Sequence, residues 1–234
     1  MRSVHISNAW LLVDEEGRRF LIDTGHAVER RALLRSLRRL GVRRRGDLTA
    51  ILLTHRHSDH AGSAAWLREH FRCPLVAHPS DASVLMGDTP RPTLARRGAP
   101  HVHEFLCRVE DRFPARSAVD EVLEHGESRW GFHAVSVAGH TEGSILLLHE
   151  ATGALFSGDA ILAGPPVQRR RARLSFALPE YSTDSEGCRR RVLSFLADEP
   201  PIESLCAGHG PMLRQPGSLL RELRVGAGEQ RLEA

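Results

Sequence analysis

One nine-residue stretch constrains this chain more than any other part of it. Residues 54–62 read Thr-His-Arg-His-Ser-Asp-His-Ala-Gly and follow the apolar run Ala-Ile-Leu-Leu at 50–53, which is typical of a buried strand. Its candidate metal ligands are His55, His57, Asp59 and His60. Imidazole nitrogens and carboxylate oxygens suit zinc, iron or manganese, and the thiolates of a purely structural zinc site are missing. Because neighbouring side chains on an extended loop diverge, we expect two metal ions or further ligands from elsewhere in the chain.

Three later segments repeat one design, in which an apolar strand-like run ends at a glycine-containing turn that carries His or Asp. They are Gly-His-Thr-Glu-Gly-Ser at 139–144, Ser-Gly-Asp at 157–159 and Gly-His-Gly-Pro at 208–211. Glycine lets the backbone turn tightly and leaves a polar side chain at the edge of the sheet. These turns add His140, Asp159 and His209 to the candidate ligands.

The order and spacing of these seven residues closely resembles the metallo-β-lactamase superfamily. The resemblance extends upstream to Phe-Leu-Ile-Asp-Thr-Gly at 20–25, where the superfamily has an early Asp-containing turn, and it spans most of the chain. It implies an α/β fold of the four-layer αββα type. A length of 234 residues with 41% hydrophobic content suits one core, so we expect residues 1–234 to form one domain.

The resemblance also implies a division of the ligands between two divalent metal ions. His55, His57 and His140 would hold one ion, Asp59, His60 and His209 would hold the other, and Asp159 would bridge them. Zinc is the expected metal, with iron or manganese as alternatives that the same ligands accept. Asp23 is interpreted as an outer partner that fixes a ligand loop.

This arrangement predicts a hydrolase. A water shared by two cations has a pKa near 7, so a metal-bridged hydroxide would cleave a small ester, thioester or lactone. Asp59 is expected to orient that water and relay its proton as the catalytic residue. The expected partner is a small-molecule substrate.

Asp159 narrows the resemblance to the glyoxalase II-like and lactonase-like branch. Lactam-cleaving members usually lack a bridging aspartate, which argues against an antibiotic-hydrolysing role. Glyoxalase II enzymes bind glutathione thioesters through an added C-terminal helical region, whereas only 25 residues follow His209 here. Quorum-sensing lactonases usually carry a tyrosine shortly after the bridging aspartate, whereas Ala-Ile-Leu follows at 160–162 and the sole tyrosine is Tyr181.

Two alternative functions remain open. Persulfide dioxygenases resemble this chain but keep one iron, here on His55, His140 and Asp159; the intact second trio favours the hydrolase. A nuclease is suggested only by a pI near 9.0 and by arginine runs at 43–45 and 169–171. Arginine supplies all 32 basic residues and aromatic residues make up only 5%, so nucleic acid is not the expected partner.

The remaining pattern predicts the other elements and the cellular context. Strands are expected at 9–13, 19–22, 49–53, 74–77, 121–123, 133–137, 144–149, 154–156 and 202–206. Helices are expected at 28–40, 62–71, 79–86 and 218–225, and after Thr183 as N-cap. Segments 87–114 and 164–181 show no clear regular element, apart from an apolar face that could start a helix at 101, and are expected to border the pocket. No apolar run approaches a membrane span, so a cytoplasmic protein with four reduced cysteines is expected.

Overall fold

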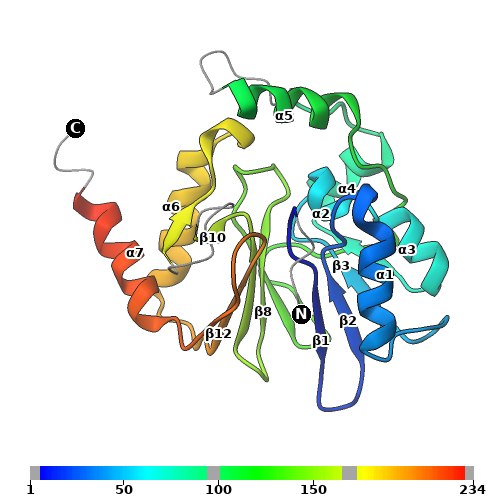
Figure 1. The fold of residues 1–234 in the computed structure, drawn as a ribbon. Helices are drawn as coiled ribbons and strands as arrows, with labels where there is room; N and C mark the ends of the chain where they lie inside the picture. The colour runs from blue at the N-terminus through cyan, green and yellow to red at the C-terminus, as the bar shows by residue number, and fades with distance from the viewer. Residues whose placement is uncertain (1–5, 94–100, 165–172, 230–234) are drawn as a thin grey trace.

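The computed structural model describes residues 6–93, 101–164 and 173–229. Two sheets face each other, and helices cover the outer face of each sheet (Figure 1). Helices α1, α3 and α4 lie on one side, and α6 and α7 lie on the other. This is the four-layer αββα sandwich that the sequence predicted.

The first sheet has five strands in the order β1-β2-β3-β4-β5. They are β1 (Trp10–Val13), β2 (Arg19–Ile22), β3 (Ala50–Leu52), β4 (Leu75–Ala77) and β5 (Glu121–Val122). Only β1 and β2 pair antiparallel; the other neighbours are parallel. The central strands β3 and β4 are buried at every residue, which explains their continuous apolar sequence.

The helices beside this sheet follow from amphipathic sequence and clear stop signals. They are the short η1 (Ala27–Glu29), α1 (Arg30–Arg39), α2 (Ser58–Ala61), α3 (Ala64–Phe71) and α4 (Pro79–Met86). In α1, Leu33 and Leu37 are buried and most arginines point outward. Helix α4 begins with a proline and ends at Gly87, whose φ of 91° suits a residue without a Cβ.

The second sheet has six strands in the order β13-β12-β9-β8-β7-β6. They are β6 (Ser128–Arg129), β7 (Phe132–Ser136), β8 (Ile145–His149), β9 (Ala154–Gly158), β12 (Ser204–Ala207) and β13 (Leu213–Arg214). Strands β9 and β12 are parallel, and the other pairs are antiparallel. Helices α6 (Ser185–Ala197) and α7 (Gly217–Glu229) cover its outer face.

The layers are joined by apolar packing between the two sheets. Phe20 of the first sheet meets Phe132 of the second edge to face, with ring centroids 5.2 Å apart. Leu52 and Phe156 belong to the same buried cluster. Two further apolar clusters lie between each sheet and its own helices. The carboxyl ends of β3, β9 and β12 therefore meet at one edge of a rigid double sheet.

The structure corrects two sequence predictions. Asp184, and not Thr183, caps α6, because the Asp184 carboxylate accepts a hydrogen bond from the Gly187 N–H at 2.9 Å. Segment 164–181 contains regular structure: β11 (Leu174–Phe176) pairs antiparallel with β10 (Ile161–Ala163), and η2 spans Pro179–Tyr181. Residues 165–172 of that segment lie outside the described residues, as do residues 94–100 of segment 87–114.

Other predictions are confirmed. The helix that starts at residue 101 is α5 (His101–Arg112), which crosses above the open edge of the two sheets (Figure 1). The four cysteines are buried thiols, as expected. Among the helices that the structure describes, none combines the length and apolarity needed to cross a membrane.

Candidate metal centre

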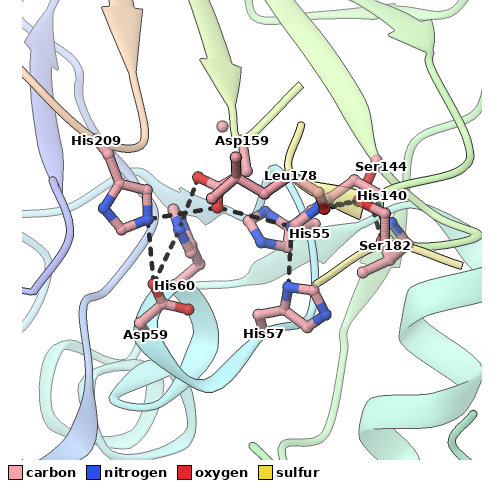
Figure 2. Close-up of polar contacts among 12 residues, drawn as sticks. His55, His57, Asp59, His60, His140, Ser144, Asp159, Leu178, Ser182 and His209 are labelled. Carbon is pink, nitrogen blue, oxygen red and sulfur yellow. Dashed lines mark hydrogen bonds and ion pairs between the residues drawn. The ribbon is translucent and has the colours of Figure 1, made fainter. Parts of the chain in front are cut away.

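The seven candidate ligands lie together at the edge where the strands of both sheets end (Figure 2). The loop after β3 carries His55 and His57, and the short α2 carries Asp59 and His60. The second sheet supplies the other three: His140 lies between β7 and β8, Asp159 follows β9, and His209 follows β12. The ligand segments therefore follow the ends of β3, β7, β9 and β12, with Asp59 and His60 placed one step further along, in α2.

One group is made only of imidazoles. The nitrogens of His55, His57 and His140 lie within 4.8 Å of one another. His57 Nδ1 and His140 Nε2 are only 2.9 Å apart. All three side chains are almost fully buried, with 1–4% of the residue surface exposed. This group, which we call the three-histidine group, offers a compact and neutral set of nitrogen ligands.

A second group, the carboxylate group, consists of Asp59, His60 and His209. Asp59 Oδ2 lies 3.5 Å from His60 Nε2 and 3.3 Å from His209 Nε2. Asp159 stands between the two groups: its carboxylate oxygens lie 3.2 Å from His60 Nε2, 3.3 Å from His209 Nε2 and 3.6 Å from His140 Nε2. Figure 2 shows Asp159 between the two sets of side chains.

Buried polar atoms without a hydrogen bond indicate that these residues suit a metal ion. Among the described residues they are the Nε2 atoms of His55, His57 and His60 and the Oδ1 atom of Asp159, of which His60 Nε2 and Asp159 Oδ1 lie 3.2 Å apart as an ion pair. Such atoms cost about 1–3 kcal/mol each when left unsatisfied. Those of His55, His60 and Asp159 lie in one small region, where a cation would satisfy them together. His57 faces the centre through Nδ1, 2.9 Å from His140 Nε2, so its Nε2 points outward.

Hydrogen bonds on the far side of the rings fix which nitrogen is available. The Thr54 hydroxyl donates to Asp23 Oδ2 at 2.8 Å, so it accepts from His55 Nδ1 at 3.1 Å. The Ser182 hydroxyl donates to the Leu178 carbonyl at 2.7 Å, so it accepts from His140 Nδ1 at 3.1 Å. In both rings the proton therefore sits on Nδ1, and the Nε2 lone pair faces the centre, as metal-binding histidines require.

Asp23 supports His60 in the same way. Its Oδ2 accepts from His60 Nδ1 at 2.9 Å, and its Oδ1 accepts from the Thr54 N–H at 2.8 Å. Asp23 is 1% exposed, and its φ of 57° lies in the left-handed region that few residues other than glycine adopt. The structure thus joins Asp23 to the ligand loop, where the sequence analysis expected an outer partner.

The protonation of the two groups differs. Burial lowers the pKa of His55 and His57 well below the usual value, and neighbouring imidazoles add to the effect, so both rings are neutral. Burial alone would raise the pKa of Asp59 and Asp159, but His60 and His209 outweigh it and hold both carboxyls well below their usual range. Burial also opposes protonation of His209, but Asp159 and Asp59 raise its pKa to about 10. The carboxylate group thus attracts positive charge.

Glycines let the backbone come close to the centre. A Cβ on Gly208 would lie 2.3 Å from Asp159 Oδ1 and 2.6 Å from His60 Cε1. At Gly158, φ is 49° and a Cβ would lie 2.4 Å from Thr54 Oγ1. The glycines of the sequence motifs are therefore needed for close approach as well as for turning.

Several residues at the site had no signal in the sequence. Asp81 binds the loops on both sides of the three-histidine group, and Glu110 of α5 accepts a hydrogen bond from the Ser58 N–H at 2.9 Å. Arg91 donates to Glu110 at 2.7 Å. The thiol of Cys107, also in α5, donates to the Glu180 carbonyl at 3.3 Å. Helix α5 is therefore tied to the ligand loop at one point and to η2 at another.

Comparison with known proteins identifies the family. A model of the metallo-beta-lactamase superfamily matches residues 2–209. The chain belongs to this superfamily. Its relatives place this superfamily member among metal-dependent hydrolases, in keeping with the cluster of histidines and carboxylates.

Relatives of this superfamily member include two bacterial proteins of similar length. "Uncharacterized protein YobT" of Bacillus subtilis (strain 168) is 29% identical over 221 residues, which cover 90% of this chain and 86% of YobT. "Hydroxyacylglutathione hydrolase GloC" of Haemophilus influenzae is 28% identical over 203 residues, which cover 87% of this chain and 85% of GloC.

Solved structures agree with the family. TTHA1623 in a di-iron-bound form has a TM-score of 0.63 and 27% identity, and the match covers 93% of both chains. The BLEG-1 B3 metallo-beta-lactamase also has a TM-score of 0.63, at 23% identity, over 93% of this chain and 94% of BLEG-1. The second likeness shows the metallo-β-lactamase fold.

Proposed function

We propose that this protein is a dinuclear metal hydrolase, with zinc as the metal, that cleaves a small ester, thioester or lactone. The observation that carries the proposal is the convergence of two ligand groups on Asp159, each with a buried ligand nitrogen that makes no hydrogen bond among the described residues. In this assignment His55, His57 and His140 would hold one cation and Asp59, His60 and His209 the other, with Asp159 available to both.

When bound, the two cations would supply an activated water as nucleophile and an electrophilic partner for the substrate carbonyl. The protein's own residues prepare that chemistry. His55 and His140 keep their Nδ1 protons on Thr54 and Ser182, so each ring offers its Nε2 lone pair in fixed orientation. Neutral His55 and His57 and ionised Asp59 and Asp159 are in the protonation states that metal binding needs. His209, whose pKa is raised to about 10, would release its proton when a cation binds.

Asp59 is the proposed catalytic residue. Its side chain is 24% exposed, more than the 15% of His209 and the 14% of Asp159, so it is the ligand most accessible to water. The pKa of Asp59 is well below its usual range because His60 and His209 outweigh the effect of burial. An ionised carboxylate at this position can orient the attacking water by accepting a hydrogen bond and can take up its proton.

The relatives support the carbonyl substrate class. GloC and the protein of Alkalilimnicola ehrlichii, which is 36% identical over 66% of this chain, carry the name hydroxyacylglutathione hydrolase. Such a substrate is a thioester. We extend the class to esters and lactones because the same nucleophile and electrophile serve any of these carbonyl groups.

Metal content tests the proposal. Protein purified without added metal or chelator should contain about two zinc ions per chain, and His209→Ala should contain about one. His125→Ala is the matched control, because His125 is exposed and belongs to neither ligand group. The loaded protein should hydrolyse members of a panel of thioesters, lactones and esters.

A different result would overturn the assignment. One iron per chain that is unchanged by His209→Ala, together with oxygen consumption on persulfides, would indicate the dioxygenase-like alternative on His55, His140 and Asp159. Cleavage of nucleic acid without hydrolysis of the panel would indicate a nuclease.

A further inference from the structure

Asp81 connects the two loops that carry the three-histidine group. It lies in the first turn of α4 and is 1% exposed. Its Oδ2 accepts hydrogen bonds from the Arg56 N–H at 2.8 Å and the Thr141 hydroxyl at 2.7 Å. Its Oδ1 accepts from Arg56 Nη1 at 2.7 Å and from the Gly143 N–H at 3.0 Å. One carboxylate therefore receives four hydrogen bonds from two separate loops.

The position of these donors relates Asp81 to the metal centre. Arg56 lies between His55 and His57 in the sequence, and Thr141 directly follows His140. Asp81 thus holds the backbone next to His57 and the backbone next to His140 at a fixed separation. The imidazoles that project from these two loops stand 2.9 Å apart, from His57 Nδ1 to His140 Nε2.

The loops are shaped for this contact. A Cβ on Gly143 would lie 2.6 Å from Asp81 N, Cβ and Cγ, so a larger residue would push the His140 loop away from Asp81. The Thr141 N–H is bound by the Ser144 hydroxyl at 2.9 Å, which closes the loop on itself. The missing side chain of Gly143 and the hydroxyl groups of Thr141 and Ser144 therefore allow the His140 loop to pack directly against the Asp81 carboxylate.

The cluster is not explained by stability alone. The side chains of Arg56 and Asp81 are each only 1% exposed, and Arg56 also pairs with Glu142 at 2.7 Å. Arg56 Nε and Nη2 are buried without a hydrogen-bond partner among the described residues. Buried ion pairs often stabilise a fold no better than apolar side chains of similar volume would. What this pair supplies is fixed geometry across two loops.

We propose that Asp81, together with Arg56, is a positioning residue that sets the separation of His57 and His140 and thereby the affinity and geometry of the metal held by the three-histidine group. This inference rests on the proposed function. Asp81 touches neither metal nor substrate, and it acts through the loops. It holds the loops of His57 and His140, whereas Asp23 contacts His60 directly and reaches His55 through Thr54.

The test uses Asp81→Asn in a His209→Ala background, where one metal should remain in the three-histidine group. Asparagine keeps the shape but loses the charge and presents an NH₂ to the donors of Arg56 or Thr141. We expect Co²⁺ affinity, measured by competition with a chelator, to fall about 10–100-fold. The visible absorption of bound Co²⁺ should also change, because ligand geometry sets it.

Asp120→Asn is the matched control. Asp120 also pairs with an arginine, Arg68, at 2.6 Å and accepts a backbone hydrogen bond from Leu75 at 2.8 Å, but it binds no ligand loop. Its replacement should leave Co²⁺ affinity and absorption unchanged. The double change Asp81→Asn and Arg56→Gln removes both charges, so it separates positioning from the penalty of a lone buried charge. The yield of folded protein should be higher in this double variant than in Asp81→Asn alone, whereas its Co²⁺ affinity should remain low.

Two results would overturn the proposal. One is a Co²⁺ affinity of Asp81→Asn that stays within about twofold of the His209→Ala parent, together with an unchanged visible spectrum. A residue that positions the ligands should lower the affinity by more than this. The other is recovery of full metal affinity in the double variant, which would give Asp81 only a structural role. Failure of the proposed function is distinguishable, because then His209→Ala would bind as much metal as the unchanged protein before Asp81 is altered at all.

Discussion

The two halves of the centre lie side by side but differ in chemistry. The three-histidine group contains only neutral nitrogen ligands, and each residue is at most 4% exposed. In the carboxylate group, the side chains of Asp59 and His209 are 24% and 15% exposed. The buried half is suited to hold a cation in fixed geometry. The open half contains the carboxylate of Asp59 and is the more accessible to water.

The contrast explains why outer partners matter differently in each half. Neutral imidazoles attract a cation through their lone pairs alone, so their separation and orientation decide the affinity. Carboxylates attract a cation at longer range, and a small displacement costs less. The buried half should therefore depend more on the residues around it.

Loss of Asp159 should give the largest effect, because its carboxylate lies within 3.6 Å of nitrogens in both halves. In Asp159→Asn we expect both metals to bind more weakly and kcat/KM to fall by more than the roughly 100-fold that an outer partner can cost. Metal analysis and rates on the best substrate of the panel measure this. Asp184→Asn is the control, and retention of two metals in Asp159→Asn would contradict the shared role.

Variants that lose one of the two metals should show that the halves release metal at different rates. His57→Ala and His209→Ala should each keep about one metal per chain. The metal left in His57→Ala sits in the open half, so a chelator should remove it about tenfold faster or more than the metal left in His209→Ala. Stopped-flow release of Co²⁺ to a coloured chelator gives both rates. Equal rates would mean that exposure does not distinguish the two halves.

Asp23→Asn should weaken the open half more than the buried half. The change removes the negative charge that His60 Nδ1 contacts directly at 2.9 Å, whereas Asp23 reaches His55 only through Thr54, and we expect about 10–100-fold lower affinity for the metal of the open half. Titration with Zn²⁺ against a chelator should show one site shifted by this factor and the other shifted less. A shift of both sites by the same factor would show that Asp23 holds the centre as a whole.

The smallest effect should come from the cap of α6, next to the His140 loop. Asp184→Ala removes the side-chain cap and should lower the free energy of unfolding by about 1 kcal/mol. The backbone hydrogen bond from Asp184 N to the Gly139 carbonyl at 2.7 Å remains, so metal content should not change. Denaturant unfolding and metal analysis of the same preparation check both statements.

Much of the fold and the ligand cluster could be predicted from sequence because both depend on local patterns. An apolar run that ends in glycine with His or Asp predicts both where a strand ends and which side chain lies at that end. The seven side chains predicted in this way do lie together. Asp81 could not be predicted, because nothing in its own segment distinguishes it from an ordinary acidic residue in the first turn of α4. Its role arises only when α4 packs beside two distant loops.

The errors have similarly physical causes. Thr183, Asp184 and Ser185 are all good N-cap residues, and the backbone path from the His140 loop decides in favour of Asp184. Strand β11 carries a weak sequence signal, and its pairing with β10 supplies the hydrogen bonds that define it.

The ligands are contributed by both sheets, four from the loop and helix after β3 and three from the turns of the second sheet. Metal bound there would therefore link the two sheets across the opening between them. With metal bound, amide hydrogens in β3 and β9 should exchange with solvent at one common rate set by whole-molecule opening. Once a chelator removes the metal, the two layers can loosen separately, and the slowest amides of each should report different opening energies.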